Sequence, residues 1–175
     1  MASAAYRVDS ESAAAGSEER GVDDDVRAKI DALLRDMRQR GRRALRIVDL
    51  GCGAGGWLIA IAKRARELGF TAIEGRGVDR DPDAIERAWA AALVRRDPAI
   101  GLTFEVGSPA GAIDDENEEG CDLLLCLGRG LADVDPGAVA GLVRAMLLCA
   151  DAAAFVMIGS GHRRRVIEAL PLRPR

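Results

Sequence analysis

The sequence predicts an α/β fold, an open and mostly parallel sheet with helices on both faces. Short apolar runs that suit buried strands alternate with segments whose apolar residues recur at helical spacing. A glycine-rich loop, 51-GCGAGG-56, separates the first of these runs from the helix that follows it. The run at 121–127 is continuous and apolar, which is typical of a central parallel strand. Repeated strand–helix units of this length predict a layered sheet with right-handed crossovers.

The N-terminal part divides into a tail and a helix. Residues 1–21 are rich in Ala, Ser, Gly and Glu without periodicity, so we expect a disordered tail there and one domain over 22–175. A helix is expected at about 23–40, because three acidic residues suit its beginning and Gly41 suits its end. Its apolar positions share one face: Val26, Ile30, Leu33, Leu34 and Met37. A solvated face explains the arginines opposite, Arg27 among them, with contact to RNA or a substrate as the alternative.

The core of the domain is expected at about 45–160. Its strands are predicted at 45–50, 71–79, 102–106, 121–127 and 152–158. Helices are expected after the glycine loop, after Pro82 and at about 139–147. The helix after Pro82 is expected to turn one face inward: Ile85, Ala88, Trp89, Ala92 and Leu93. We expect a solvated loop at 114–119, with a cation-attracting lid as the alternative, and only one short helix in 162–175.

Composition excludes several classes of function. A net charge of −3 and a pI near 5.3 count against a nucleic-acid binder, which usually shows a basic footprint. The four cysteines have no C-x-x-C spacing and only one histidine accompanies them, so we expect buried reduced thiols and no metal site. The sequence has no run of 18 apolar residues and no apolar segment near its N-terminus. We therefore expect a cytoplasmic protein that does not bind membranes.

The glycine loop is the strongest functional signal. Gly51, Gly53 and Gly56 fit the G-x-G-x-x-G pattern, which lies where an open parallel sheet binds its ligand. Asp79 ends the second predicted strand 28 residues after Gly51, where a ribose-binding acid is expected. The alternative is a tight structural turn with a solvated Asp79.

Asp49 discriminates between ligands for this loop. A dinucleotide would bring two phosphates to the helix that follows, and a carboxylate two residues before Gly51 opposes their charge. S-adenosylmethionine instead carries a sulfonium and an ammonium group, together with a ribose for Asp79. The pair of acids therefore favours S-adenosylmethionine over the cofactor of a nucleotide-dependent oxidoreductase.

The segments 48-VDLGCGAGGW-57, 77-GVDRDPDAIERA-88 and 121-CDLLLCLG-128 resemble the class I S-adenosylmethionine-dependent methyltransferases, of the small bacterial type. The resemblance implies a Rossmann-like sheet of strand order 3-2-1-4-5, here without C-terminal strands 6 and 7. It also implies roles for eight residues. Asp49 matches the acid that holds the methionine end, and Asp79 the acid that grips the ribose. The remaining matches lie around the cofactor: Gly51, Cys52, Gly53, Arg80, Ser108 and Leu127.

The acceptor side departs from this family. The loop 128-GRGLADVD-135 lacks the usual Ser-His pair, and Ser160 and His162 replace an acid and an aromatic residue after the fifth strand. His162 and Arg129 are the candidates for a base and an anion contact; surface positions are the alternative. We expect a methyltransferase acting on a small molecule, or a binding protein that has lost catalysis. An RNA methyltransferase is disfavoured by the acidic charge, and an open edge at the fifth strand favours self-association. Whether the native chain continues past Arg175 is left open.

Overall fold

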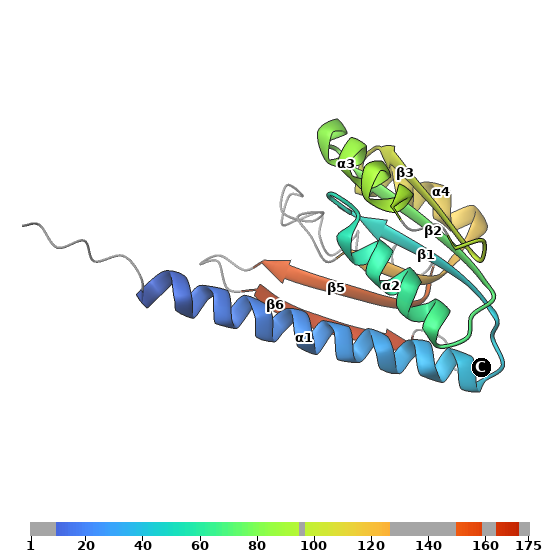
Figure 1. The fold of residues 1–175 in the computed structure, drawn as a ribbon, viewed down its shortest axis with the longest axis horizontal. Coiled ribbons are helices and arrows are strands. Elements are labelled where there is room, and N and C mark those ends of the chain that lie inside the picture. The colour runs from blue at the N-terminus through green and yellow to red at the C-terminus, as the bar shows by residue number, and fades with distance from the viewer. Residues whose placement is uncertain (1–9, 95–96, 127–149, 159–163, 172–175) are drawn as a thin grey trace, which may run out of the picture.

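A computed structural model describes the backbone of residues 10–94, 97–126, 150–158 and 164–171, and side chains within 24–126 except at 95–96 and 117–119. The elements follow one another along the chain as α1 (Ser10–Gln39), β1 (Ala44–Leu50), α2 (Gly56–Glu67), β2 (Ala72–Asp79), α3 (Pro82–Leu93), β3 (Ile100–Val106), α4 (Pro109–Glu119), β4 (Cys121–Cys126), β5 (Ala150–Ile158) and β6 (Arg164–Pro171). The six strands form one sheet, and helices cover both of its faces (Figure 1).

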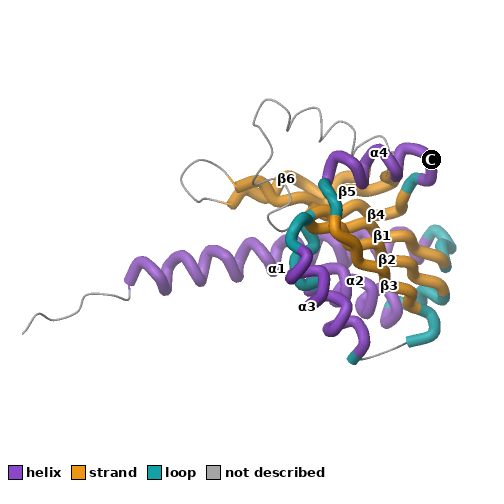
Figure 2. The backbone as a smooth tube through the Cα atoms, turned by 90° about the horizontal axis from the view of Figure 1, so that it is seen from above, coloured by secondary structure: helices purple, strands orange, loops and turns teal. Residues whose placement is uncertain are grey.

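The strand order is β3-β2-β1-β4-β5-β6, which confirms the predicted order 3-2-1-4-5. The first five strands are parallel, and β6 pairs with β5 in the antiparallel direction. Two helices, α2 and α3, lie with α1 on one face, and α4 lies on the other (Figure 2). Because parallel strands end at the same edge, the loops after β1, β2 and β3 meet there.

The C-terminal segment corrects the prediction of a short helix in 162–175 and of a sheet that stops at the fifth strand. Residues 164–171 form β6 instead. Val166 and Ile167 are β-branched, and the outer edge of β5 offers unpaired backbone groups to a neighbouring strand. One antiparallel strand thus completes the sheet, and no seventh strand lies within the described ranges. β5 is therefore not an edge strand, so the predicted open edge for self-association does not lie there. β6 takes that edge of the sheet, and α1 contacts β6.

The first helix corrects the predicted boundary of the N-terminal tail. It begins at Ser10 rather than at about residue 23, so most of the segment expected to be disordered is helical. Alanine and glutamate, which have high helix propensity, make up six of the thirteen residues 10–22. The absence of an apolar period misled the prediction, because the helix continues back to Ser10 without one (Figure 1).

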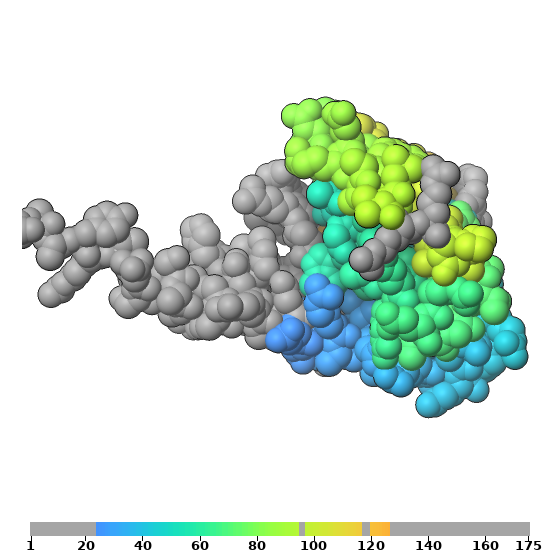
Figure 3. All heavy atoms as spheres, viewed as in Figure 1, coloured from blue at the N-terminus to red at the C-terminus, as the bar shows by residue number. Residues whose placement is uncertain are grey.

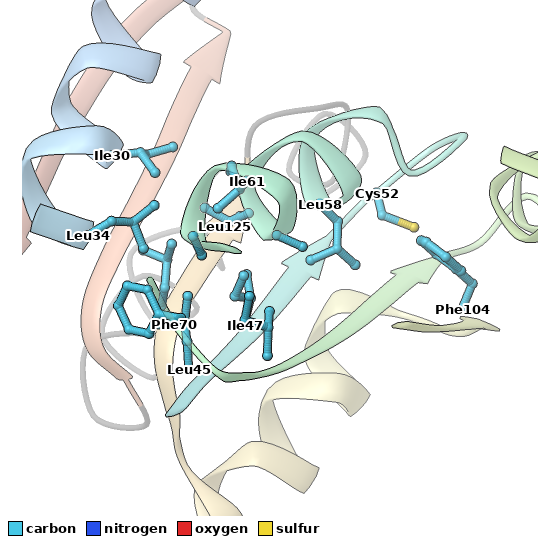
Figure 4. Close-up of a cluster of buried hydrophobic side chains, with 14 of the residues drawn as sticks. Ile30, Leu34, Leu45, Ile47, Cys52, Leu58, Ile61, Phe70, Phe104 and Leu125 are labelled. Atoms are coloured by element: carbon cyan, nitrogen blue, oxygen red, sulfur yellow. The ribbon is translucent and has the colours of Figure 1, made fainter. Parts of the chain in front are cut away.

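The main core fills the space between the sheet and the face that carries α1 and α2. Phe70 and a set of aliphatic side chains are buried together (Figure 4): Ile30, Leu34, Leu45, Ile47, Leu58, Ile61 and Leu125. The residues predicted to form the buried face of α3 are only partly buried. Ile85 and Ala88 are buried, whereas Trp89 and Leu93 are 42% and 55% exposed. β3 is an edge strand, so the outer flank of α3 has no neighbouring strand to cover it.

The acidic run 114–119 is not a loop but belongs to α4, which begins at Pro109 behind the cap Ser108. Glu116 of this helix is fully buried, which also corrects the expectation of a solvated segment. Its carboxylate accepts hydrogen bonds from Arg46 on β1 and Arg76 on β2, at 3.1 and 3.0 Å. These partners lie far away in the sequence, so the pattern of charges in 114–119 alone gave no sign of them.

Candidate functional site

The glycine loop is fastened to the end of the neighbouring strand. The backbone N–H groups of Gly51 and Cys52 both donate to the Val78 carbonyl, at 2.8 and 3.1 Å. Gly51 and Gly53 have φ of 73° and 54°, which a side chain disfavours by about 1–2 kcal/mol. The chain therefore leaves β1 in a tight left-handed turn and enters α2 at Gly56. This geometry brings backbone atoms, rather than side chains, to the edge where a ligand is expected.

Asp79, at the end of β2, reaches across to this loop. Its Oδ2 accepts the N–H of Gly53 at 2.8 Å, and its Oδ1 accepts the N–H of Asp81 at 2.9 Å. A carboxylate has about four lone-pair positions, so each oxygen keeps one for a further donor. The two backbone bonds fix the carboxylate before any ligand arrives. Asp79 is thus oriented, partly exposed and able to accept two hydroxyl groups.

Asp49, the penultimate residue of β1, is 1% exposed. Burial chiefly, and the negative charge of Asp79 next, raise the pKa of this carboxyl to about 7, while a hydrogen bond from the Leu58 N–H lowers it. Its Oδ2 has no hydrogen-bond partner in the described part of the chain. Ionising a buried carboxyl group with one unbonded oxygen is costly, and a cationic group would relieve that cost.

The loop rests on Phe104 of β3. A Cβ at Gly55, where φ is 74°, would lie 2.8 Å from the Phe104 ring, and one at Gly77 would lie 2.6 Å from it. The Cys52 thiol packs beside Gly77, so its side chain supports the loop from below. Trp89 holds the other side of the ring edge-on and donates its indole N–H to the Phe104 carbonyl at 2.9 Å. Sequence reasoning missed this support, because β3 gave only a weak alternating pattern.

The other predicted residues take different places. Cys52 contributes through its backbone, and burial followed by the charge of Asp49 raises the pKa of its thiol to about 12, so the thiol stays protonated. Arg80 directly follows Asp79 and is exposed. Ser108 caps α4 by accepting the Gly111 N–H at 3.1 Å, an unforeseen role that uses one acceptor position of its hydroxyl. Leu127, Arg129 and His162 lie outside the described residues.

The structure bears on two expectations drawn from the composition, one about the cysteines and one about membrane-spanning helices. Cys52, Cys121 and Cys126 are buried free thiols, as predicted, while the fourth cysteine lies outside the described residues. Among the helices that the structure describes, none has the length and apolar character needed to cross a bilayer.

The fold is that of class I S-adenosylmethionine-dependent methyltransferases, as comparison with solved structures shows. The bifunctional kinase-methyltransferase WbdD is 23% identical, with a TM-score of 0.59 over 76% of this chain and 28% of that chain. Magnesium protoporphyrin IX methyltransferase from Synechocystis PCC 6803, with bound cofactor, is 14% identical, with a TM-score of 0.52 over 90% of this chain and 66% of that one. A cyclopropane synthase from Mycobacterium tuberculosis gives a TM-score of 0.52 at 14% identity, over 74% and 41% of the two chains.

These similarities are structural and distant. The chain spans little more than a quarter of the length of the WbdD structures that it matches. A scan of protein-family models and a search of curated proteins gave no match. Structural similarity at this level of sequence identity shows a shared fold, and a shared fold does not by itself determine function.

Proposed function

We propose that this chain binds S-adenosylmethionine at the ends of β1 and β2 and transfers its methyl group to a small-molecule acceptor. The observation that carries the proposal is the buried Asp49, whose Oδ2 has no partner among the described residues and whose pKa the nearby charge of Asp79 raises. Two acids at one edge of the sheet favour a cationic ligand and oppose a pyrophosphate. A sulfonium nucleoside with an ammonium group fits both the charge and the ribose contact.

Each residue of the site has a binding task in this proposal. Asp79 accepts the two ribose hydroxyls with its remaining lone pairs, and the glycine loop brings its backbone close to the ligand. Asp49 attracts the cationic methionine end. When bound, S-adenosylmethionine supplies the activated methyl carbon, so the chain's main contribution is to hold that carbon in line with the acceptor. Such positioning is worth roughly 7–11 kcal/mol in favourable reactions.

The alternative is a protein that binds S-adenosylmethionine without catalysing transfer. The sequence after β4 favours it, because 128-GRGLADVD-135 lacks the Ser-His pair of the small methyltransferases. The catalytic candidates His162 and Arg129 also lie outside the described residues. Both readings share the cofactor site and differ only in turnover, so one binding experiment and one transfer experiment separate them.

Calorimetry with S-adenosylhomocysteine and with NAD tests the cofactor. We expect binding of the first only, and Asp79→Ala should weaken it by about 1.5–3 kcal/mol, the cost of losing hydrogen bonds to a charged group. Glu86→Ala, which removes an exposed acid from α3, is the matched control and should bind normally. NAD binding, or equal affinity in the Asp79 variant, would refute the assignment. Methyl transfer to a panel of metabolites then separates the enzyme from the binding protein.

A further inference from the structure

The aromatic contact between Trp89 of α3 and Phe104 of β3 supports the segments that form the candidate cofactor site. A Cβ placed on Gly55 would lie 2.8 Å from the Phe104 ring, and one placed on Gly77 would lie 2.6 Å from it. Gly55 belongs to the loop after β1, whereas Gly77 precedes Asp79 by two residues in β2. The ring therefore packs against the backbone of both segments, and whatever fixes the ring also bears on the loop.

Trp89 is the residue that covers this ring. Its indole meets the Phe104 ring edge-on, with the ring centroids 5.6 Å apart and the planes at 79°. Phe104 is only 4% exposed, although β3 is an edge strand. α3 lies at the surface of the molecule (Figure 3), and Trp89 is 42% exposed. Within the described ranges no further strand lies beyond β3, so Trp89 contributes cover that a neighbouring strand provides elsewhere in the sheet.

The indole also holds the backbone of Phe104. In a parallel ladder, alternate residues of a strand turn their N–H and C=O groups toward the same neighbour. The Gly107 N–H donates to the Asp79 carbonyl of β2 at 2.9 Å, so Phe104, three residues earlier, turns its carbonyl away from β2. The indole N–H of Trp89 donates to that carbonyl at 2.9 Å. One side chain thus fixes both the ring and the main chain of Phe104.

We propose that Trp89 is a positioning residue for the cofactor loop: it holds the Phe104 ring against Gly55 and so keeps the loop joined to β2. The joint is the hydrogen bond from the Gly53 N–H to Asp79 Oδ2, at 2.8 Å. Without Trp89 the ring loses its edge-on partner and is free to change its rotamer. The loop then opens more often, because its support has gone. The effect on the loop stands by itself, and its consequence for cofactor binding rests on the proposed function.

Hydrogen exchange of the loop amides tests this without any ligand. Gly53 and Gly55 donate their N–H groups to Asp79 Oδ2 and to the Cys52 carbonyl, so their exchange rates, measured by NMR, report how often the loop opens. Trp89→Phe keeps an aromatic ring but loses the indole N–H, and it should speed both amides about fivefold, the worth of one hydrogen bond. Trp89→Ala also loses the ring contact and should speed them about thirtyfold.

Leu93→Ala is the matched control, because it removes a 55% exposed apolar side chain one turn further along α3. The loop amides should exchange at the parent rate in this variant. If Trp89 served only global stability, its variants would speed the amides that exchange by global unfolding, such as that of Leu124 in β4, and leave Gly53 and Gly55 unchanged. That pattern, or equally fast loop exchange in Leu93→Ala and Trp89→Ala, would overturn the proposal.

Calorimetry with S-adenosylhomocysteine on the same variants tests the consequence for binding. The unsupported loop relaxes before the ligand arrives, so part of the lost contact energy appears as weaker binding. We expect the dissociation constant to rise on the order of fivefold in Trp89→Ala and to keep the parent value in Leu93→Ala. If the parent binds the ligand and Trp89→Ala binds it equally well, Trp89 does not position the cofactor site. If the parent does not bind it, the proposed function fails, while the exchange rates still decide whether Trp89 holds the loop.

Discussion

We expect Asp49 to make the stability of the fold and the proposed binding of S-adenosylmethionine respond to pH in opposite ways. Its pKa is raised from 3.8 to about 7, first by burial and then by Asp79. A carboxyl whose pKa is higher in the folded than in the unfolded chain stabilises the fold while it is protonated. That contribution is complete below pH 4 and is lost as pH rises to 7. With about three pH units at 1.36 kcal/mol each, the loss is on the order of 4 kcal/mol in the protein without ligand.

The variant Asp49→Asn stays neutral at every pH and isolates this effect. We expect the difference in unfolding free energy between Asp49→Asn and the parent to shift in favour of the variant by about 1.4 kcal/mol per pH unit from pH 5 to pH 7. Above pH 7 the difference should level off. Urea unfolding at half-unit pH steps measures it, and Glu86→Gln, an exposed acid on α3, is the control that should show no such trend.

Binding of S-adenosylmethionine should follow the opposite course. The cation binds the ionised carboxylate, so affinity should rise about tenfold per pH unit below pH 7. Calorimetry between pH 5.5 and 7.5 keeps the amino group of the ligand largely protonated. Asp49→Asn should bind weakly and without this slope. A parent protein whose affinity is constant over this range, or a variant with the same slope, would refute the role given to Asp49.

Two further predictions concern the scaffold. Gly55→Ala should lower the unfolding free energy by at least about 2 kcal/mol, because φ is 74° and the new Cβ meets the Phe104 ring. Gly56→Ala is the control and should be neutral, because a Cβ there meets open space. Equal effects of the two substitutions in urea unfolding would show that the turn at Gly55 is ordinary. Glu116→Ala should cost about 1–3 kcal/mol, because it removes the fully buried carboxylate that the half-buried Arg46 and Arg76 share, while Arg76 keeps Glu105 and Asp115. Asp115→Ala removes a 64% exposed partner of Arg76 and should cost less than about 1 kcal/mol; a similar cost for both would mean that Glu116 is solvated.

The sequence predicted the parts of this fold that local patterns encode. Alternating strands and helices predicted the α/β sheet, the family resemblance implied the strand order, and Asp49, Gly51, Gly53 and Asp79 lie at one edge of the sheet. Glu116 could not be foreseen, because its burial depends on Arg46 and Arg76 from two other strands. β6 was missed for a similar reason, since its pairing depends on an edge that only the assembled sheet provides.

The Phe104 ring also limits which residues can occupy positions 55 and 77. The ring leaves no room for a side chain at Gly55 or at Gly77, which belong to different elements. At Gly77 the constraint is one of volume, set chiefly by the Phe104 ring at 2.6 Å and also by the Cys52 Sγ at 3.0 Å, so a smaller residue at 104 would relieve most of it. In related chains we therefore expect the sizes of residues 77 and 104 to vary inversely. Gly55 should stay invariant in either case, because its backbone conformation would still require glycine.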